Sequence, residues 1–304
     1  MMSAPGLTVT SPSHLPSPAA PTRALADFVA LMKPRVNLLV VMTTGIGFYL
    51  GATGIDPWRV FHALVGTGLV ASGAAAFNQI YERDIDRLMR RTQGRPLPSG
   101  RLEVGEARWF AAALALAGLV ELGLGTTWLA AAVAVATIVS YALVYTPLKT
   151  RTSLATVVGA VPGALPPVIG WAAASGTLPI QAWSLFAIVF FWQMPHVLAV
   201  SWMYREDYER GGIRVLPVVE PDGASTARQI VSYAAALIPV SLLPTATGLA
   251  GDVYLVAAIA LGLALLGLSI AFAREHTRER ARRLFYGSLL YLPVLWVVLI
   301  MNRN

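Results

Sequence analysis

The chain has no cysteine, and charged residues make up only 13% of its 304 positions. Without cysteine it can form no disulfide, thiolate nucleophile, Cys-ligated zinc site or iron–sulfur cluster. The low charge content goes with 56% hydrophobic residues and a positive mean hydropathy. This composition excludes an ordinary soluble domain and predicts a polytopic membrane protein.

Nine hydrophobic stretches are long enough to cross a bilayer, since a spanning helix needs about 20 mostly apolar residues. Glycine and proline are frequent within these stretches, as is normal for packed membrane helices. We therefore predict an all-α bundle of nine transmembrane helices. The stretches cover residues 36–54, 58–79, 108–126, 127–146, 154–174, 179–203, 229–250, 252–273 and 284–301.

The basic residues indicate how such a bundle is oriented. With the N-terminus inside, all but two of the 23 Lys and Arg residues fall on the inner side, the exceptions being Arg59 and Arg303. This is the bias that the positive-inside rule requires, and it predicts an outer C-terminus. A bacterial inner membrane is the simplest location. The net charge of +7 follows from the same bias, so it does not call for a nucleic-acid partner.

We expect residues 1–24 to form a disordered cytoplasmic tail and residues 25–304 to form one membrane-embedded domain. The tail is rich in Pro, Ser, Thr and Ala, a composition that cannot bury much apolar surface. It lacks the apolar core of a signal peptide and has no arginine before Arg23, unlike a mitochondrial transit peptide.

One polar segment lies where the second span meets an arginine-rich loop. On a helix, Asn78, Glu82 and Asp86 are four residues apart and share one face, whereas Asp84 points elsewhere. An amide and two carboxylates suit Mg²⁺, which binds through a few oxygen ligands together with substrate phosphates. Arg91 and Arg95 follow and can hold further phosphate oxygens. The alternative is a solvated helix end with scattered charges.

A second long loop predicted on the inner side, about residues 204–228, also begins with carboxylates among arginines, including Asp207. Two acidic helix ends on one side of the membrane can face each other and hold metal ions on a diphosphate. This arrangement predicts that the chemistry takes place at a cytoplasmic mouth of the bundle.

Other polar groups have both a functional and a structural interpretation. Lys149 and Arg151 lie in a tight inner turn, and Lys33 and Arg35 precede the first span. They either neutralise a diphosphate or anchor the helices by the positive-inside rule. His196 lies inside a span, where a polar residue is a functional candidate; alternatively, it bonds backbone groups that Pro195 leaves free.

From about residue 25 to 300 the chain resembles the UbiA-type intramembrane prenyltransferases, and within them the branch that farnesylates haem. The first motif of the superfamily, Asn-acid-acid at spacings of four, is matched by Asn78, Glu82 and Asp86. The other markers are 33–36 (KPRV), Arg91 to Pro96, 145–149 (YTPLK), Pro166 to Trp171, Trp192 to His196, Tyr204 to Tyr208, and 216–217 (LP).

The second motif of the superfamily departs from its usual pattern. Two aspartates four residues apart, followed by glycine, are expected. Asp207 and Gly211 are present, but Met203 stands at the position of the earlier aspartate. The number of bound metal ions is therefore left open.

The resemblance implies that farnesyl is transferred from farnesyl diphosphate to a vinyl group of haem b, with water adding a hydroxyl, to give the haem O used by haem–copper oxidases. Mg²⁺ is the implied cofactor, and the lipid bilayer, haem A synthase or oxidase assembly factors are candidate partners. The implied metal ligands are Asn78, Glu82, Asp86 and Asp207; the diphosphate-binding residues are Arg91, Arg95, Lys149, Arg151, Lys33 and Arg35; the residues for carbocation or haem contact are Tyr141, Tyr145, Trp192 and His196.

Three alternatives remain at this stage. A related prenyltransferase would act on an aromatic quinone precursor or a chlorophyllide. A transporter would place its polar groups near the bilayer midplane, whereas the acids here cluster at one end. A non-catalytic assembly factor for a haem protein would have no use for two carboxylate clusters.

Overall fold

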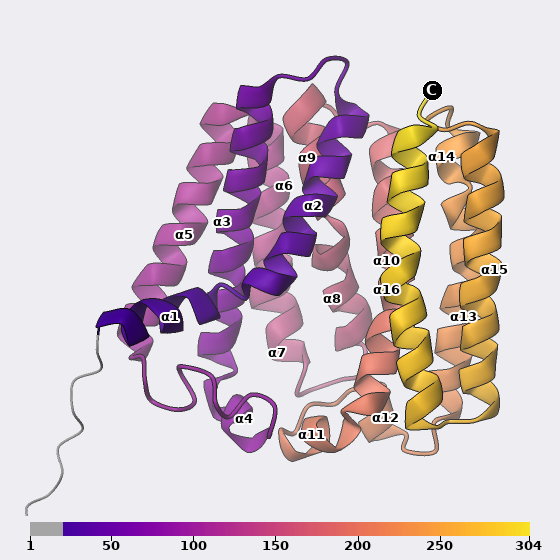
Figure 1. Ribbon diagram of the computed structural model, residues 1–304. Helices are drawn as coiled ribbons and strands as arrows, with labels where there is room; N and C mark the ends of the chain where they lie inside the picture. The colour runs from indigo at the N-terminus through magenta and orange to yellow at the C-terminus, as the bar shows by residue number, and fades with distance from the viewer. Residues whose placement is uncertain (1–20) are drawn as a thin grey trace, which may run out of the picture.

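The computed structural model describes residues 21–304, which form a bundle of helices (Figure 1). Residues 1–20 of the expected tail lie outside the described residues. Residues 21–24, which we predicted to belong to the tail, instead form the first turn of helix α1 (Pro21–Leu31). Proline suits this position because the first N–H groups of a helix have no helical partner.

Nine helical segments within residues 21–304 are of membrane length, in agreement with the prediction. Eight of them are long and apolar enough to cross a bilayer. The other, α2 (Pro34–Gly51), has 18 residues and is about 27 Å long at 1.5 Å per residue. The remaining single helices are α3 (Pro57–Tyr81), α5 (Val104–Gly125), α10 (Ile180–Met203), α15 (Asp252–Arg274) and α16 (Arg278–Met301).

Three of the nine segments are interrupted. The π-helical segment η1 (Val139–Tyr145) joins α6 (Trp128–Ile138) to α7 (Thr146–Leu148). Prolines break the other two, because proline removes a helical hydrogen bond: one becomes α8 (Ala155–Ala164) and α9 (Pro166–Ser175), and the other α13 (Ala224–Ser241) and α14 (Leu243–Ala246).

Two helices start five or more residues before the predicted spans. Helix α13 begins at Ala224 instead of residue 229, and α16 begins at Arg278 instead of residue 284. In both cases a polar first turn extends the helix beyond its apolar stretch. The side chain of Thr277 caps α16 by accepting a hydrogen bond from the backbone N–H of Arg280.

In the first half of the bundle, glycines allow neighbouring helices to pack closely. Helix α2 crosses α9 so closely that a Cβ at Gly47 would collide with the backbone oxygen of Pro167. A Cβ at Gly170 would collide in the same way with the carbonyl oxygen of Thr44. Such small-residue contacts are the usual way for membrane helices to approach each other.

Four of the shorter helices lie toward the end of the bundle opposite the C-terminus (Figure 1). They are α1, α4 (Arg83–Leu88), α11 (Arg205–Arg210) and α12 (Leu216–Val219). The two long polar loops therefore meet at the same end of the molecule, as the sequence predicted.

Candidate active site

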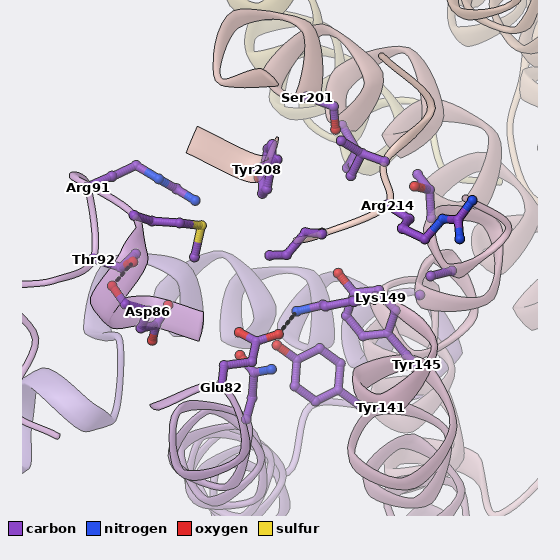
Figure 2. A pocket seen from close by; sticks show the side chains of 18 of the residues that line it. Glu82, Asp86, Arg91, Thr92, Tyr141, Tyr145, Lys149, Ser201, Tyr208 and Arg214 are labelled. Carbon is purple, nitrogen blue, oxygen red and sulfur yellow. Dashed lines mark hydrogen bonds and ion pairs between the residues drawn. The ribbon is translucent and has the colours of Figure 1, made fainter. Parts of the chain in front are cut away.

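A polar cavity of about 380 Å³ lies at the end of the bundle that carries α4 and α11 (Figure 2). Segments distant in the sequence contribute to it, from the start of α2 to the loop after α11. Its charged and polar lining consists of Lys33, Asn78, Glu82, Asp86, Arg91, Thr92, Arg95, Tyr141, Tyr145, Lys149, Thr156, Gln193, Ser201, Tyr208 and Arg214.

The structure brings Asn78, Glu82 and Asp86 together in this cavity. Although α3 ends at Tyr81, helical spacing continues, because Glu82 N donates to Asn78 O (2.9 Å) and Asp86 N to Glu82 O (2.7 Å). All three side chains are buried. Asp84 faces solvent and pairs with Arg83. The spacing of four thus produces one acidic face.

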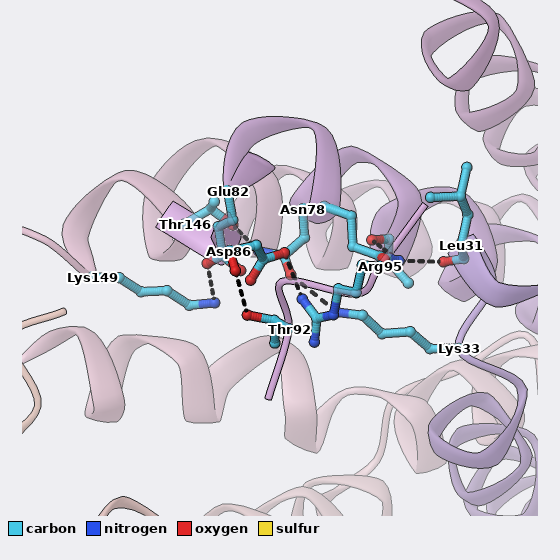
Figure 3. A network of polar contacts seen from close by, with 11 residues as sticks. Leu31, Lys33, Asn78, Glu82, Asp86, Thr92, Arg95, Thr146 and Lys149 are labelled. Atoms are coloured by element: carbon cyan, nitrogen blue, oxygen red, sulfur yellow. Dashed lines mark hydrogen bonds and ion pairs between the residues drawn. The ribbon is translucent and has the colours of Figure 1, made fainter. Parts of the chain in front are cut away.

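Each buried carboxylate contacts a cation from another segment (Figure 3). Lys149 Nζ lies 2.5 Å from Glu82 Oε1, and Arg95 Nη1 lies 2.7 Å from Asp86 Oδ2. Burial opposes the charge on Lys149, but Tyr145 and Glu82 outweigh it and raise its pKa above the ordinary value. Burial raises the pKa of Asp86, although Arg95 acts in the opposite direction. The carboxylates and the basic side chains of the cavity therefore affect each other's pKa.

Lys33 is a third cation in contact with Asn78, Glu82 or Asp86. It lies just before α2 in the left-handed region, with φ 50°, and its Nζ donates to Asn78 Oδ1 at 3.2 Å. Burial, together with the nearby charges of Arg95 and Lys149, lowers the pKa of Lys33 to about 8. This strained backbone brings a lysine that precedes the first span into contact with the acidic face.

The donor set fits a hard cation such as Mg²⁺. Asp86 Oδ1 is buried and has no hydrogen-bond partner within residues 21–304, although an unpaired buried carboxylate oxygen is costly. A cation would satisfy it. The described residues contain no group of three His, Cys, Asp or Glu placed to hold a metal. The candidate ligands here are two carboxylates and the amide of Asn78, which suits an ion that keeps several waters.

Asp207 is not among the residues that line this cavity. It faces a separate pocket of about 290 Å³, which Met203 also lines. Its carboxylate accepts hydrogen bonds from the side chain of Arg210 and from the backbone N–H of Arg90 (3.2 Å). The structure therefore does not bring Asp207 together with the ligands of the first motif.

The predicted phosphate-binding residues separate into two groups. Lys33, Arg91, Arg95 and Lys149 all line the cavity. Arg35 and Arg151 are exposed and do not line it. Lys33 and Lys149 thus face the cavity, whereas the basic residue two positions after each of them does not.

Aromatic rings cover one wall of the cavity. Tyr141 and Tyr145 project from η1, with ring centroids 5.4 Å apart, and Lys149 Nζ lies 4.4 Å from the Tyr145 centroid. Gly159 of α8 leaves the space for this ring, since a Cβ there would be 2.5 Å from Tyr145 Cε2. Tyr208 of α11 faces the same space (Figure 2).

An apolar groove of about 510 Å³ adjoins the cavity, and Val36 lines both. The groove lies between α2, α10 and α16, and Trp192 forms part of its wall. His196, one turn further along α10, lines neither space; its Nδ1 lies 2.9 Å from Ser288 Oγ. The structure therefore places Trp192 in the wall of the groove and His196 at the contact between α10 and α16.

Some lining residues were not assigned a role from the sequence. Tyr208 and Gln193 stand inside motifs that carried the resemblance, but their spacing alone gave them no chemistry. Arg214 reaches the cavity because its backbone N–H donates to Lys149 O at 2.8 Å, which fixes the loop after α11 against the turn after α7. No sequence signal indicates this contact.

Residues 40–295 match the model of the UbiA prenyltransferase family. The chain belongs to this family, and it is therefore a multi-pass membrane prenyltransferase.

Several relatives that are named protoheme IX farnesyltransferase match nearly the whole chain. A protoheme IX farnesyltransferase from Solibacter usitatus is 50% identical over 289 residues, covering 92% of this chain and 99% of the relative. One from Koribacter versatilis is 44% identical over 308 residues, covering 98% and 99%.

Solved structures share the fold at low identity. A digeranylgeranylglyceryl phosphate synthase gives a TM-score of 0.78 at 18% identity, covering 92% of this chain and 98% of that one. A UbiA homologue from Archaeoglobus fulgidus, solved with DMAPP and Mg²⁺, gives 0.64 at 15%, covering 90% and 99%.

Proposed function

We propose that this protein transfers a farnesyl group from farnesyl diphosphate to a vinyl group of haem b, with addition of water, to give haem O. The structural observation that carries this proposal is the polar cavity, with its paired acids and cations, beside an apolar groove. A prenyl diphosphate needs both surroundings, one for each end. The choice of haem as acceptor rests on the names of the relatives, at up to 50% identity.

Asn78, Glu82 and Asp86 would hold Mg²⁺, and the unpaired Oδ1 of Asp86 supports this assignment. A bound Mg²⁺ supplies Lewis-acid activation and orientation of the diphosphate. We leave Asp207 out of the ligand set, because it faces a separate pocket and does not line the cavity that holds these three residues.

Lys149, Arg95 and Arg91 bind the diphosphate and stabilise the negative charge that grows on it as the carbon–oxygen bond breaks. Arg91 lies over the Tyr204 ring, 5.3 Å from its centroid, which holds the guanidinium at the rim. The faces of Tyr141 and Tyr145 stabilise the allylic cation. Burial of the site limits the water that can quench this cation.

The groove beside Trp192 would take apolar parts of the substrates from the bilayer. His196 remains our candidate for haem contact. Its Nδ1 is engaged with Ser288, and its other ring nitrogen makes no hydrogen bond within residues 21–304. That nitrogen is available to the haem iron or to a propionate.

The charge bias supports a site at the cytoplasmic face of a bacterial inner membrane, with the C-terminus outside. Farnesyl diphosphate fits such a mouth, since its tail is apolar and its head anionic.

The test is a transfer assay on purified protein in detergent, with haem b, farnesyl diphosphate and Mg²⁺, and with the product detected by mass. We expect a haem heavier by one farnesyl group and one hydroxyl group. EDTA and Asp86→Asn should abolish the product, because EDTA removes the metal and the substitution removes a carboxylate that would hold it. Asp84→Asn is the matched control: it removes an exposed acid of the same helix and should retain activity.

If haem stays unchanged while an aromatic quinone precursor or a chlorophyllide is prenylated, the acceptor is wrong and the reaction class is right. Folded protein that prenylates no acceptor would refute the enzymatic proposal. Equal losses in Asp84→Asn and Asp86→Asn would remove the support for the metal site.

A further inference from the structure

Gln193 is a polar residue of the cavity that the mechanism above does not use. It lies on α10, where its Nε2 donates to the backbone oxygen of Ala160 on α8 at 2.7 Å. A carbonyl oxygen only accepts hydrogen bonds, so this contact fixes which end of the amide faces α8. The amide oxygen is then left as an acceptor for a different partner.

Oε1 of Gln193 accepts no hydrogen bond from the protein within residues 21–304. It faces Gly163, where a Cβ would collide with it. Gly163 lines the apolar groove, whereas Gln193 lines the polar cavity. The unused acceptor therefore lies at the boundary between the two spaces.

The backbone of α8 has further acceptors at Gly163 and at the residue before it. Residues 166 and 167 are both proline. They have no N–H to offer the carbonyls of Pro162 and Gly163, which would be their helical partners. A water molecule bound here can donate one hydrogen to Gln193 and the other to a freed carbonyl, leaving its lone pairs for a cation.

The reacting carbon of a prenyl diphosphate joins the polar head to the apolar chain, so it must lie where the cavity meets the groove. Resting on the function proposed above, we infer that Gln193 positions the water that becomes the hydroxyl group of the product. Gly163 contributes by leaving space for the amide oxygen.

The chemistry balances as follows. The bond from farnesyl C1 to diphosphate breaks, and oxygen keeps the electron pair. The terminal vinyl carbon of haem uses its π electrons to bond C1, which leaves the inner vinyl carbon positive. The oxygen of the positioned water bonds that carbon, and its proton passes to the released diphosphate. Without this water, the cation loses a carbon-bound proton and forms an alkene, lighter by one water.

The test measures the ratio of hydroxylated to alkene product by mass, with H₂¹⁸O to label the incorporated oxygen. Gln193→Leu keeps the size of the side chain and removes the acceptor. We expect its ratio to fall by at least about tenfold, the effect of roughly 1.4 kcal/mol in one of two competing steps. Gly163→Ala, which displaces the amide oxygen and keeps Gln193, should change the ratio in the same direction.

Gln181→Leu is the matched control. Gln181 lies at the opposite end of α10 and donates to Thr247 O at 3.1 Å, so its loss removes a similar interhelical bond away from the cavity. It should leave the product ratio unchanged. A purely structural role for Gln193 would lower the total yield and leave the ratio alone.

An unchanged ratio in both Gln193→Leu and Gly163→Ala, with haem still farnesylated, would overturn this inference and leave the proposed function intact. Wild-type protein that farnesylates no haem would overturn both.

Discussion

At the scale of single residues, the cavity is built from buried carboxylates that each touch a cation from another part of the chain. Glu82 pairs with Lys149 and Asp86 with Arg95. A buried charge is tolerated only when it is paired, so these contacts offset the cost of burying the carboxylates within the fold. The same cations face the space where a diphosphate would bind.

Lys149→Met should therefore be damaging in two ways. It leaves Glu82 buried without its partner, which we expect to cost about 3–5 kcal/mol of stability. It also removes a cation from the leaving group, which should lower the transfer rate by at least about 100-fold. Thermal unfolding in detergent and the transfer assay measure the two effects separately.

Arg151→Met provides the comparison for Lys149. It removes a cation two residues away that is exposed and lines no cavity. Its stability should stay within about 0.5 kcal/mol of wild type. Comparable damage from both substitutions would show that general charge in this turn matters, and that the Glu82 contact does not.

At the scale of helices, close crossings decide where the site residues lie. Helix α2 carries Lys33 at its start and is held against α9 through Gly47. The breaks at prolines shape α8 and α9, and Gly159 and Gly163 of α8 leave room for Tyr145 and Gln193. Small residues in these helices therefore create the space that larger residues on neighbouring helices occupy.

Gly47→Ala tests the crossing of α2 and α9. Its Cβ would collide with backbone, which cannot rotate away, so we expect a loss of about 1–3 kcal/mol or more. Gly45→Ala on the same helix makes an ordinary contact, 3.4 Å from Leu64 Cδ2, and should be tolerated. Thermal unfolding of the two variants decides the matter; equal losses would argue against the tight crossing.

At the scale of the whole molecule, charge is segregated between the two ends. The acids and cations of the cavity gather with α4 and α11, whereas the C-terminus lies at the opposite end (Figure 1). Arg303, one of the few basic residues at that end, donates to the carbonyl oxygens of Tyr49 and Ala52 at 2.6 Å. Its charge thus also has a structural use at the end of α2.

The chain without cysteine allows a direct test of orientation. Gly54→Cys lies in the exposed connection between α2 and α3, and Gln93→Cys in the exposed loop beside the cavity. A membrane-impermeant maleimide applied to intact spheroplasts should label Gly54→Cys alone. Permeabilised cells should allow labelling of both, and unmodified protein should show none. The reverse pattern in intact spheroplasts would invert the proposed topology.

The class of the protein and the acidic face of its site could be predicted from the amino-acid sequence. Hydrophobic runs of membrane length can form only a limited set of structures in lipid, so nine helices followed from composition. The alignment of Asn78, Glu82 and Asp86 followed from helical geometry, because a spacing of four is a local property of the backbone.

Which distant groups share the cavity depends on tertiary packing and could not be predicted from local spacing. Lys33 and Lys149 enter it while Arg35 and Arg151 do not, and Asp207 faces a different pocket. These outcomes depend on how α2, α8 and α11 pack, and the sequence does not state such contacts between distant segments. The position of Gln193 at the junction of cavity and groove is of the same kind, since Ala160 and Gly163 fix it from another helix.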